Sequence, residues 1–340
     1  MKIMQNFLIL FGSIIIIVGV GGVLLLQKHA LKKAPALKLG FVANPVGGLV
    51  QIAINKNFFK DENLNVSFGQ FTCGNFALQA LVGGSLDVAV AAEFPVTLVA
   101  LNKEKLVILS QVSESTDSII LKKEGEWFDA ASYFSKKRKI AVAAGTTSEF
   151  FALEFFKKHN VSPSQYELVN MRPEDSPIAF ANGDVDGVAM FEPFASFARQ
   201  QAGEDKVFEI PIPDLHETLM LLVAKPDWAY QHADEIEKLL RALKQAERFA
   251  RANPAESQAI VSSFTKLDVQ TLSNIWHLYT LELGLARRLF STMEREAQWA
   301  KDQGRVPKET VIPNFRDMIF EAPLKKVSPA SIDLGRVNTY

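Results

Sequence analysis

The chain carries the same sequence pattern twice, about one hundred residues apart, and this duplication limits the folds that it can adopt. Three pairs of segments match in the same order: 38–43 with 139–144, 55–60 with 155–161, and 84–95 with 183–193. In the third pair, glycine, aspartate and glutamate keep the same spacing in both copies. Solenoid repeats are much shorter than this period, so the duplication predicts two related lobes.

Each copy alternates short apolar runs with segments of helical spacing. The strands predicted for the first copy are 37–43, 65–71, 88–92 and 106–111. Such alternation is typical of a parallel sheet with crossover helices. We therefore predict an α/β protein of two Rossmann-like lobes. Lobe 1 comprises 37–116 and 217–334 with the C-terminal helices, lobe 2 comprises 117–216, and a strand at 219–224 crosses back to lobe 1.

The turn that starts at Gly145 is the strongest candidate for a ligand contact. It follows a strand-like run, carries hydroxyl side chains at Thr146, Thr147 and Ser148, and opens a helical pattern. The first backbone N–H groups of a helix lack helical partners, and the positive end of the helix dipole favours an anion. The alternative is a capping box, in which Thr146 and Glu149 satisfy the helix end themselves.

Loops at the carboxyl ends of strands bind ligands in open α/β sheets, and two facing lobes bring both sets of loops to one cleft. The candidate ligand-binding residues in these loops are Asn44, Pro45, Gly74, Asn75, Glu93, Phe94, Thr146, Thr147, Ser148, Phe191 and Glu192. Glu93 and Glu192 occupy equivalent places, where a carboxylate can bind an amine or remain a solvated rim charge. Asn75 can equally be a helix N-cap, and the two phenylalanines can equally pack inside the lobes.

Composition excludes several classes of function. A net charge of −1 gives no basic excess for nucleic acid. The single cysteine, Cys73, rules out an internal disulfide and a cysteine-rich metal site, and the five histidines are scattered. The sequence has no Gly-x-Ser-x-Gly elbow, no P-loop and no His-Glu-x-x-His motif. We therefore expect a protein that is not an enzyme and that needs no cofactor or metal.

The first 36 residues form a separate segment. Residues 6–26 are almost wholly apolar, and about 20 such residues span a bilayer. A secretory signal has a shorter apolar core, and the small-x-small match at 34–36 contains a proline. We predict an uncleaved membrane anchor at 6–26, a tether at 27–36, and a remainder on the periplasmic side of the inner membrane. A cleaved signal that releases a soluble periplasmic protein is the alternative.

Residues 38–334 resemble the periplasmic substrate-binding proteins of ABC importers, in the nitrate/sulfonate/taurine family that is SsuA-like or NMT-type. The segments that carry the resemblance are 77–90, 142–150, 191–193 and 313–324. The resemblance implies a type II periplasmic-binding-protein fold with a hinge and a small-molecule ligand between the lobes. It also implies ABC permease and ATPase partners, and it matches residues 145–148 to the family's ligand-anion loop and Glu192 to the cleft mouth.

Two other functions remain open from the sequence. One is a membrane-tethered ligand-sensing domain that uses the same pocket without transport. The other is an enzyme similar to the thiamine-pyrimidine synthases, which this chain matches poorly because it lacks their cysteine-rich motif.

Overall fold

A computed structural model gives the structure of the protein and describes residues 36–212 and 216–334. The chain divides into two compact units, Met1–Ala36 and Leu37–Tyr340, and the description below concerns the second. The predicted membrane anchor at 6–26 lies outside the described residues. Within the described ranges, no helix is both long enough and apolar enough to span a bilayer.

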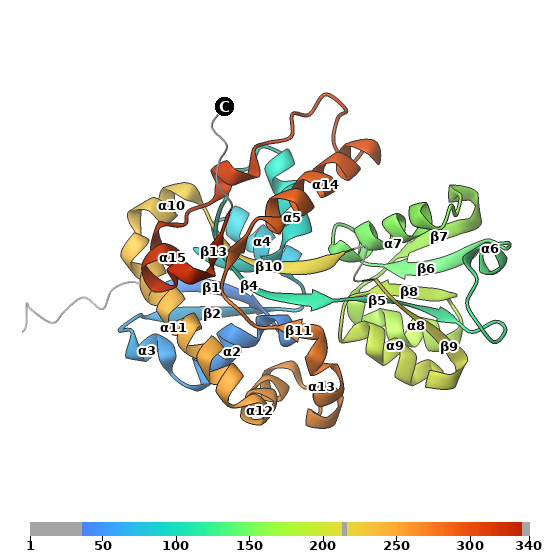
Figure 1. Ribbon diagram of the computed structural model, residues 1–340, viewed down its shortest axis with the longest axis horizontal. Coiled ribbons are helices and arrows are strands. Elements are labelled where there is room, and N and C mark those ends of the chain that lie inside the picture. Colours follow the sequence, from blue (N-terminus) through green and yellow to red (C-terminus); the bar gives the residue numbers. More distant parts are fainter. Residues whose placement is uncertain (1–35, 213–215, 335–340) are drawn as a thin grey trace, which may run out of the picture. The chain divides into compact units, whose positions relative to one another are not determined.

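Two β-sheets organise the second unit (Figure 1). The strands of the first sheet, in spatial order, are β11 Tyr279–Thr280, β4 Val107–Thr116, β10 Glu217–Ala224, β3 Val88–Ala92, β1 Leu37–Val42 and β2 Val66–Phe71. Those of the second sheet are β7 Tyr166–Asn170, β6 Arg138–Val142, β8 Gly187–Met190, β5 Ser118–Lys122 and β9 Val207–Pro211. The order β2-β1-β3-β10-β4 is the counterpart of β7-β6-β8-β5-β9, so the duplication in the sequence is also a duplication of topology.

One pair of backbone contacts shows the repeat at atomic level. The N–H of Lys38 donates to Asp87 Oδ2 at 2.8 Å, and the N–H of Lys139 donates to Asp186 Oδ2 at the same distance. Each aspartate precedes the third strand of its copy and fastens it to the first strand. The conserved spacing of these aspartates within the chain therefore fixes the entry of β3 and of β8 into their sheets.

The prediction of parallel sheets is wrong for β10 and the short β11 in the first sheet and for β5 in the second. β1 pairs in parallel with β2 and β3, and β6 pairs in parallel with β7 and β8. β10 is antiparallel to both of its neighbours, and so is β5. The reason is that the chain enters β5 and β10 from the other sheet, at the edge where the parallel strands end, and must run back against them.

The chain crosses between the sheets twice, and the two crossings are joined. Asp117 alone separates β4 from β5, and residues 212–216 separate β9 from β10. The N–H of Ile212 donates to the carbonyl oxygen of Asp117 at 3.1 Å. Asp117 is fully buried.

Helices cover the sheets (Figure 1). In the two copies they are α2 Gly48–Asn55, α3 Phe58–Asp61, α4 Gly74–Val82, α5 Glu93–Leu101, α6 Ala130–Tyr133, α7 Thr147–Lys158, α8 Ser176–Asn182 and α9 Phe194–Ala202. The C-terminal helices are α10 Pro226–Gln231, α11 Ala233–Ala252, α12 Pro254–Thr265, α13 Val269–Ile275, α14 Arg288–Asp302 and α15 Ala322–Val327. The apolar spacing over 285–301 predicts a helix, but α14 begins only at Arg288, because β12 (Leu285–Ala286) pairs with β13 (Ile332–Asp333).

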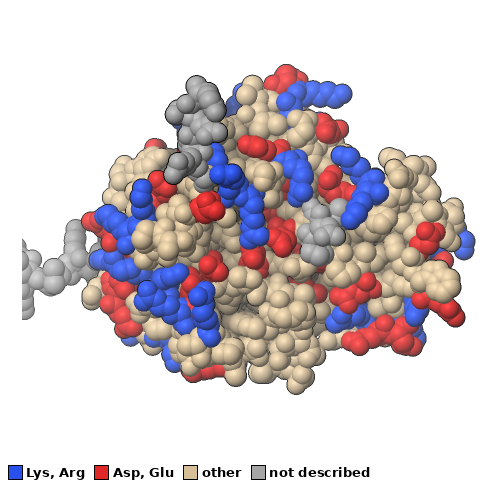
Figure 2. All heavy atoms as spheres, in the orientation of Figure 1, with Lys and Arg blue, Asp and Glu red and all other residues tan. Residues whose placement is uncertain are grey.

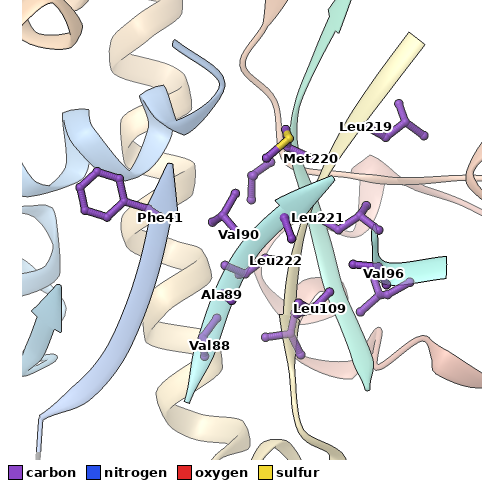
Figure 3. Close-up of a cluster of buried hydrophobic side chains, with 14 of the residues drawn as sticks. Phe41, Val88, Ala89, Val90, Val96, Leu109, Leu219, Met220, Leu221 and Leu222 are labelled. Atoms are coloured by element: carbon purple, nitrogen blue, oxygen red, sulfur yellow. The ribbon is translucent and has the colours of Figure 1, made fainter. Parts of the chain in front are cut away.

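The centre of the first sheet is the main apolar core (Figure 3). Val90 of β3 pairs with Leu222 of β10, Val88 pairs with Ala224, and all four residues are fully buried. Strands covered on both faces need continuous apolar runs, which these two strands have. On the face shown in Figure 2, Lys and Arg side chains are interspersed with Asp and Glu side chains, so this face offers no basic surface for nucleic acid.

Candidate functional site

A small pocket lies where the loops of both sheets meet. Its lining residues are Val42, Asn44, Val46, Cys73, Gly74, Asn75, Ala92, Pro95, Ser115, Thr146, Thr147, Phe191, Glu192, Thr218 and Met220. The cavity volume is about 40 Å³. Seven of the predicted ligand-binding residues are among them: Asn44, Gly74, Asn75, Thr146, Thr147, Phe191 and Glu192. Their contact with a ligand remains a prediction, but the structure brings them to one place.

Asn44 is fixed in the pocket wall by its own loop. Its Oδ1 accepts a hydrogen bond from the N–H of Val46 at 3.2 Å, and so caps the 3₁₀ helix Pro45–Gly47. The side chain of Gln51 donates to the carbonyl oxygen of Asn44 at 2.8 Å. The buried Asn44 is therefore held rigidly before any ligand binds.

The start of α4 approaches β3 closely, and Gly74 permits this approach. A Cβ atom at Gly74 would lie 2.9 Å from the Cα atom of Ala91, which is too close for any side chain. The N-cap position is Cys73 rather than the predicted Asn75. Burial raises the pKa of the Cys73 thiol, which makes it an unreactive thiol. The Oδ1 atom of Asn75 is buried and has no hydrogen-bond partner in the described structure.

At the start of α7, one threonine caps the helix and the next has a hydroxyl group available to a ligand. Thr146 Oγ1 accepts from the N–H of Ser148 at 3.2 Å and donates to the carbonyl oxygen of Ala143 at 2.7 Å, so Thr146 caps the helix. The capping box is displaced by one residue, because Glu149 Oε2 accepts from the N–H of Gly145 at 2.9 Å. The hydroxyl of Thr147 makes no hydrogen bond to the described residues and lines the pocket.

Glu192 contributes the carboxyl group of the pocket. Its side chain is 2% exposed. Oε2 accepts from the N–H of Ser196 at 3.2 Å, whereas Oε1 has no partner among the described residues. Burial raises the pKa of Glu192 to about 7, the charges of Asp117 and Glu209 act in the same direction, and the hydrogen bonds from Ser196 act against it. Near neutral pH this carboxyl therefore gains or loses its proton with small changes in its surroundings.

Four predicted ligand-binding residues do not line the pocket. Pro45 is buried inside its 3₁₀ helix, and Phe94 packs against Phe150 and Trp299 at ring distances of 5.5 and 5.4 Å. Ser148 Oγ donates to the carbonyl oxygen of Ala189 at 2.6 Å and accepts from the N–H of Ala143 at 2.9 Å. Glu93 Oε2 accepts from the N–H of Leu219 at 2.7 Å. The side chains of Ser148 and Glu93 thus bind protein backbone groups, and those of Pro45 and Phe94 pack inside the protein.

Sequence patterns did not predict the pocket residues that belong to β4 and β10, the strands next to the crossing segments. Ser115 is the last but one residue of β4, and Thr218 and Met220 lie in the first half of β10. The strand predicted at 106–111 ends before Ser115, and β10 runs antiparallel to β3, so its N-terminal residues reach the pocket. Polar residues near these ends of the two strands are the feature of the sequence that indicates them.

A buried acidic cluster lies beside the pocket. Glu93, His216 and Glu296 offer ligand atoms that all lie within 4.8 Å of one another. However, the guanidinium group of Arg295 lies 3.5 Å from His216 Nδ1, and a guanidinium can only donate. His216 Nε2 lies 2.7 Å from Glu93 Oε1, so these two atoms already pair with each other rather than with a metal. We interpret the cluster as a proton-sharing network, in which Thr97 also donates to Glu296 at 3.0 Å.

Two sheets of matched strand order, joined by two crossing segments around one pocket, form a periplasmic binding protein fold. The crystal structure of the periplasmic aliphatic sulphonate binding protein SsuA from Escherichia coli aligns with a TM-score of 0.71 and 20% sequence identity, over 84% of this chain and 97% of that chain. The family model described as NMT1/THI5 like matches residues 44–257, and the chain belongs to this family. The family resemblance predicted from the sequence is confirmed.

Two further relatives are binding proteins by name. A Brucella abortus protein, named as a candidate binding protein, is 24% identical over 256 residues, which cover 73% of this chain and 77% of that protein. The taurine-binding periplasmic protein of Escherichia coli is 23% identical over 208 residues, which cover 59% of this chain and 62% of that protein.

Proposed function

We propose that this protein is the solute-binding component of an ABC import system and captures a small organic anion or zwitterion, of the sulfonate, nitrate or taurine type, between two lobes. The observation that carries the proposal is the pocket that loops of both sheets line, at the edge where their parallel strands end. Open α/β sheets bind ligands at this edge. The names of the relatives support the same class of ligand.

The proposed lobes are 37–116 with 217–334, and 117–216, as expected from the sequence. Strand membership supports this division, because all strands of the second sheet lie between Ser118 and Pro211. We expect the lobes to rotate about the two crossing segments. A ligand that contacts both lobes favours the closed arrangement, which the permease and ATPase partners then recognise.

The pocket residues have different proposed roles in ligand binding. Thr147 and the first N–H groups of α4 and α7 would bind the anionic part of the ligand, because they lie at the positive ends of helix dipoles. Phe191 would cover an apolar part, and its ring is already held edge-to-face against Phe194 at 5.7 Å. Asn44 and Thr146 would shape the pocket, since their polar atoms already have partners.

The location follows from the N-terminal sequence. We propose that residues 6–26 anchor the protein on the periplasmic side of the inner membrane, with a cleaved signal and a soluble protein as the alternative. Extraction of membranes with alkaline carbonate tests this: an anchored protein stays in the pellet at full chain mass, and a cleaved one is soluble and shorter.

The ligand proposal is tested by isothermal titration calorimetry of the full chain against alkanesulfonates, aminoalkanesulfonates, nitrate, bicarbonate and short carboxylates. We expect at least one of them to bind with a dissociation constant of about 1 mM or lower. Absence of binding by every member of this set would refute the proposed ligand class.

A further inference from the structure

The pocket contains buried hydrogen-bond acceptors that lack donors. Asn75 Oδ1 and Glu192 Oε1 both have no hydrogen-bond partner within the described residues, and both residues line the cavity. Asn75 belongs to α4 beside the first sheet, and Glu192 follows β8 of the second sheet, so the two acceptors come from different lobes. A buried acceptor without a donor loses its hydration and gains nothing in return. A ligand with N–H groups would supply the hydrogen bonds that both atoms lack.

The electrostatics of the pocket point the same way. Among the described residues that line it, none is a lysine, an arginine or a histidine. A second carboxyl group, that of the fully buried Asp117, accepts a hydrogen bond from Thr218 in the wall, and its Oδ1 has no hydrogen-bond partner among the described residues. Burial raises the pKa of the Tyr279 hydroxyl, and the charges of Glu192 and Asp117 act in the same direction. Buried carboxylates are stable when a cation accompanies them, and the described lining supplies none.

The other side of the pocket suits a negative group. Gly74 and Asn75 begin α4, and Thr147 begins α7, so two helix N-termini contribute to the lining. Thr147 Oγ1, which has no hydrogen bond to the described residues, adds a hydroxyl donor. The cavity of about 40 Å³ leaves room for a compact ligand only. The pocket thus places acceptors and carboxyl groups close to anion-favouring helix ends.

Building on the proposed function, we propose that the ligand is a compact zwitterion whose primary ammonium group donates to Glu192 Oε1 and Asn75 Oδ1. Its anionic group, a sulfonate or a carboxylate, lies at the starts of α4 and α7. The ammonium supplies the charge that the pocket lacks and joins the two lobes through one donor group. Simple anions of the same size leave Glu192 without a partner and repel its carboxylate.

The matched pair 2-aminoethanesulfonate and propane-1-sulfonate tests this inference, because the two differ in an ammonium and a methyl group of similar size. In calorimetry at pH 8 with the full chain, we expect the ammonium compound to bind at least about tenfold more tightly, since a charge-assisted hydrogen bond of this kind is worth that factor or more. The pair 3-aminopropanoate and butanoate tests the carboxylate form of the same chemistry in the same way.

Glu192→Gln keeps the shape and removes the charge, and we expect it to reduce the ratio of the two affinities to below about threefold. Glu167→Gln, on the exposed β7, is the matched control and should leave the ratio unchanged. Equal or tighter binding of propane-1-sulfonate to the unaltered protein overturns this inference and leaves the proposed function standing. Binding of neither member of either pair, nor of nitrate or bicarbonate, overturns both.

Discussion

The hydroxyl group of Thr218 donates a 2.7 Å hydrogen bond to Asp117 Oδ2, and both residues are buried. Asp117 forms the first crossing between the sheets and Thr218 stands just after the second, so this bond joins the two crossings side chain to side chain. The backbone bond from Ile212 to Asp117 joins them a second time. A hinge between the lobes would turn about this pair.

Thr218→Val tests how much the hydrogen bond between Thr218 and Asp117 contributes to stability. The change removes the hydroxyl donor to Oδ2 of the buried Asp117 carboxyl, whose Oδ1 already has no hydrogen-bond partner in the described structure. We expect the free energy of unfolding at pH 7 to fall by about 1–3 kcal/mol, measured by chemical denaturation. Thr280→Val, at an exposed position of the same sheet, should change it by less than about 0.5 kcal/mol. Equal effects of the two variants would contradict the assignment.

The pH dependence of binding follows from the carboxyl group of Glu192. Its pKa of about 7 means that an ammonium ligand must first displace a proton when the pH is lower. We expect the affinity for 2-aminoethanesulfonate to be constant above pH 7 and to fall by up to about tenfold per pH unit below it. Calorimetry between pH 5.5 and pH 8.5 measures this slope.

Two variants distinguish the titration of Glu192 from that of nearby carboxyl groups in the same measurement. Glu192→Gln should remove most of the slope. Asp117, whose pKa is raised to about 6 by burial, titrates in the lower part of the same range, so Asp117→Asn should alter the profile only below about pH 6. A profile that Glu192→Gln leaves unchanged would assign the titration to another group.

The two hydroxyl residues Thr147 and Ser148 should differ in what they affect. Ser148→Ala removes the partner of two buried backbone groups, at Ala143 and Ala189, and we expect a loss of about 1–3 kcal/mol in the free energy of unfolding. Thr147→Val removes a hydroxyl group that faces the pocket, and we expect stability within about 0.5 kcal/mol of the unaltered protein and ligand affinity about three- to tenfold lower. Denaturation curves measure the stability of both variants, and calorimetry measures their ligand affinity. Lower affinity in Ser148→Ala with unchanged affinity in Thr147→Val would make Ser148 the ligand contact.

Spacing in the sequence predicted which residues are equivalent, but not what they touch. Asp87 and Asp186 bind corresponding backbone groups, because their partners belong to the same repeat. Glu93 and Glu192 are also equivalent in spacing, yet Glu93 meets Leu219 of the returning strand, whereas Glu192 meets Ser196 four residues ahead. The spacing of the two glutamates does not show which of them contacts the returning strand and which contacts the helix that follows it.

The residues that line the pocket were also predicted only in part. Loops after β1, β2, β6 and β8 lie at the pocket as expected, because a parallel strand delivers its C-terminal loop to one edge of the sheet. The contribution of Ser115 was not predicted because the strand expected at 106–111 ends before it. The contribution of Thr218 was not predicted because the antiparallel strand β10 brings its N-terminal residues to that edge. Apolar runs do not reveal strand direction.

Glu296→Gln tests the proton-sharing network. Burial, and then the charge of Glu93, raise the pKa of Glu296 well above its usual value, so the folded protein keeps a proton that the unfolded chain releases above about pH 4.3. The free energy of unfolding therefore falls as the pH rises above that value. Glutamine cannot ionise and still accepts from Thr97, so we expect the variant to gain stability relative to the unaltered protein as the pH rises from 5 to 8. Denaturation at three pH values measures the gain, and Glu294→Gln, exposed on α14, should show none; a constant or shrinking difference would mean that Glu296 is ionised when folded.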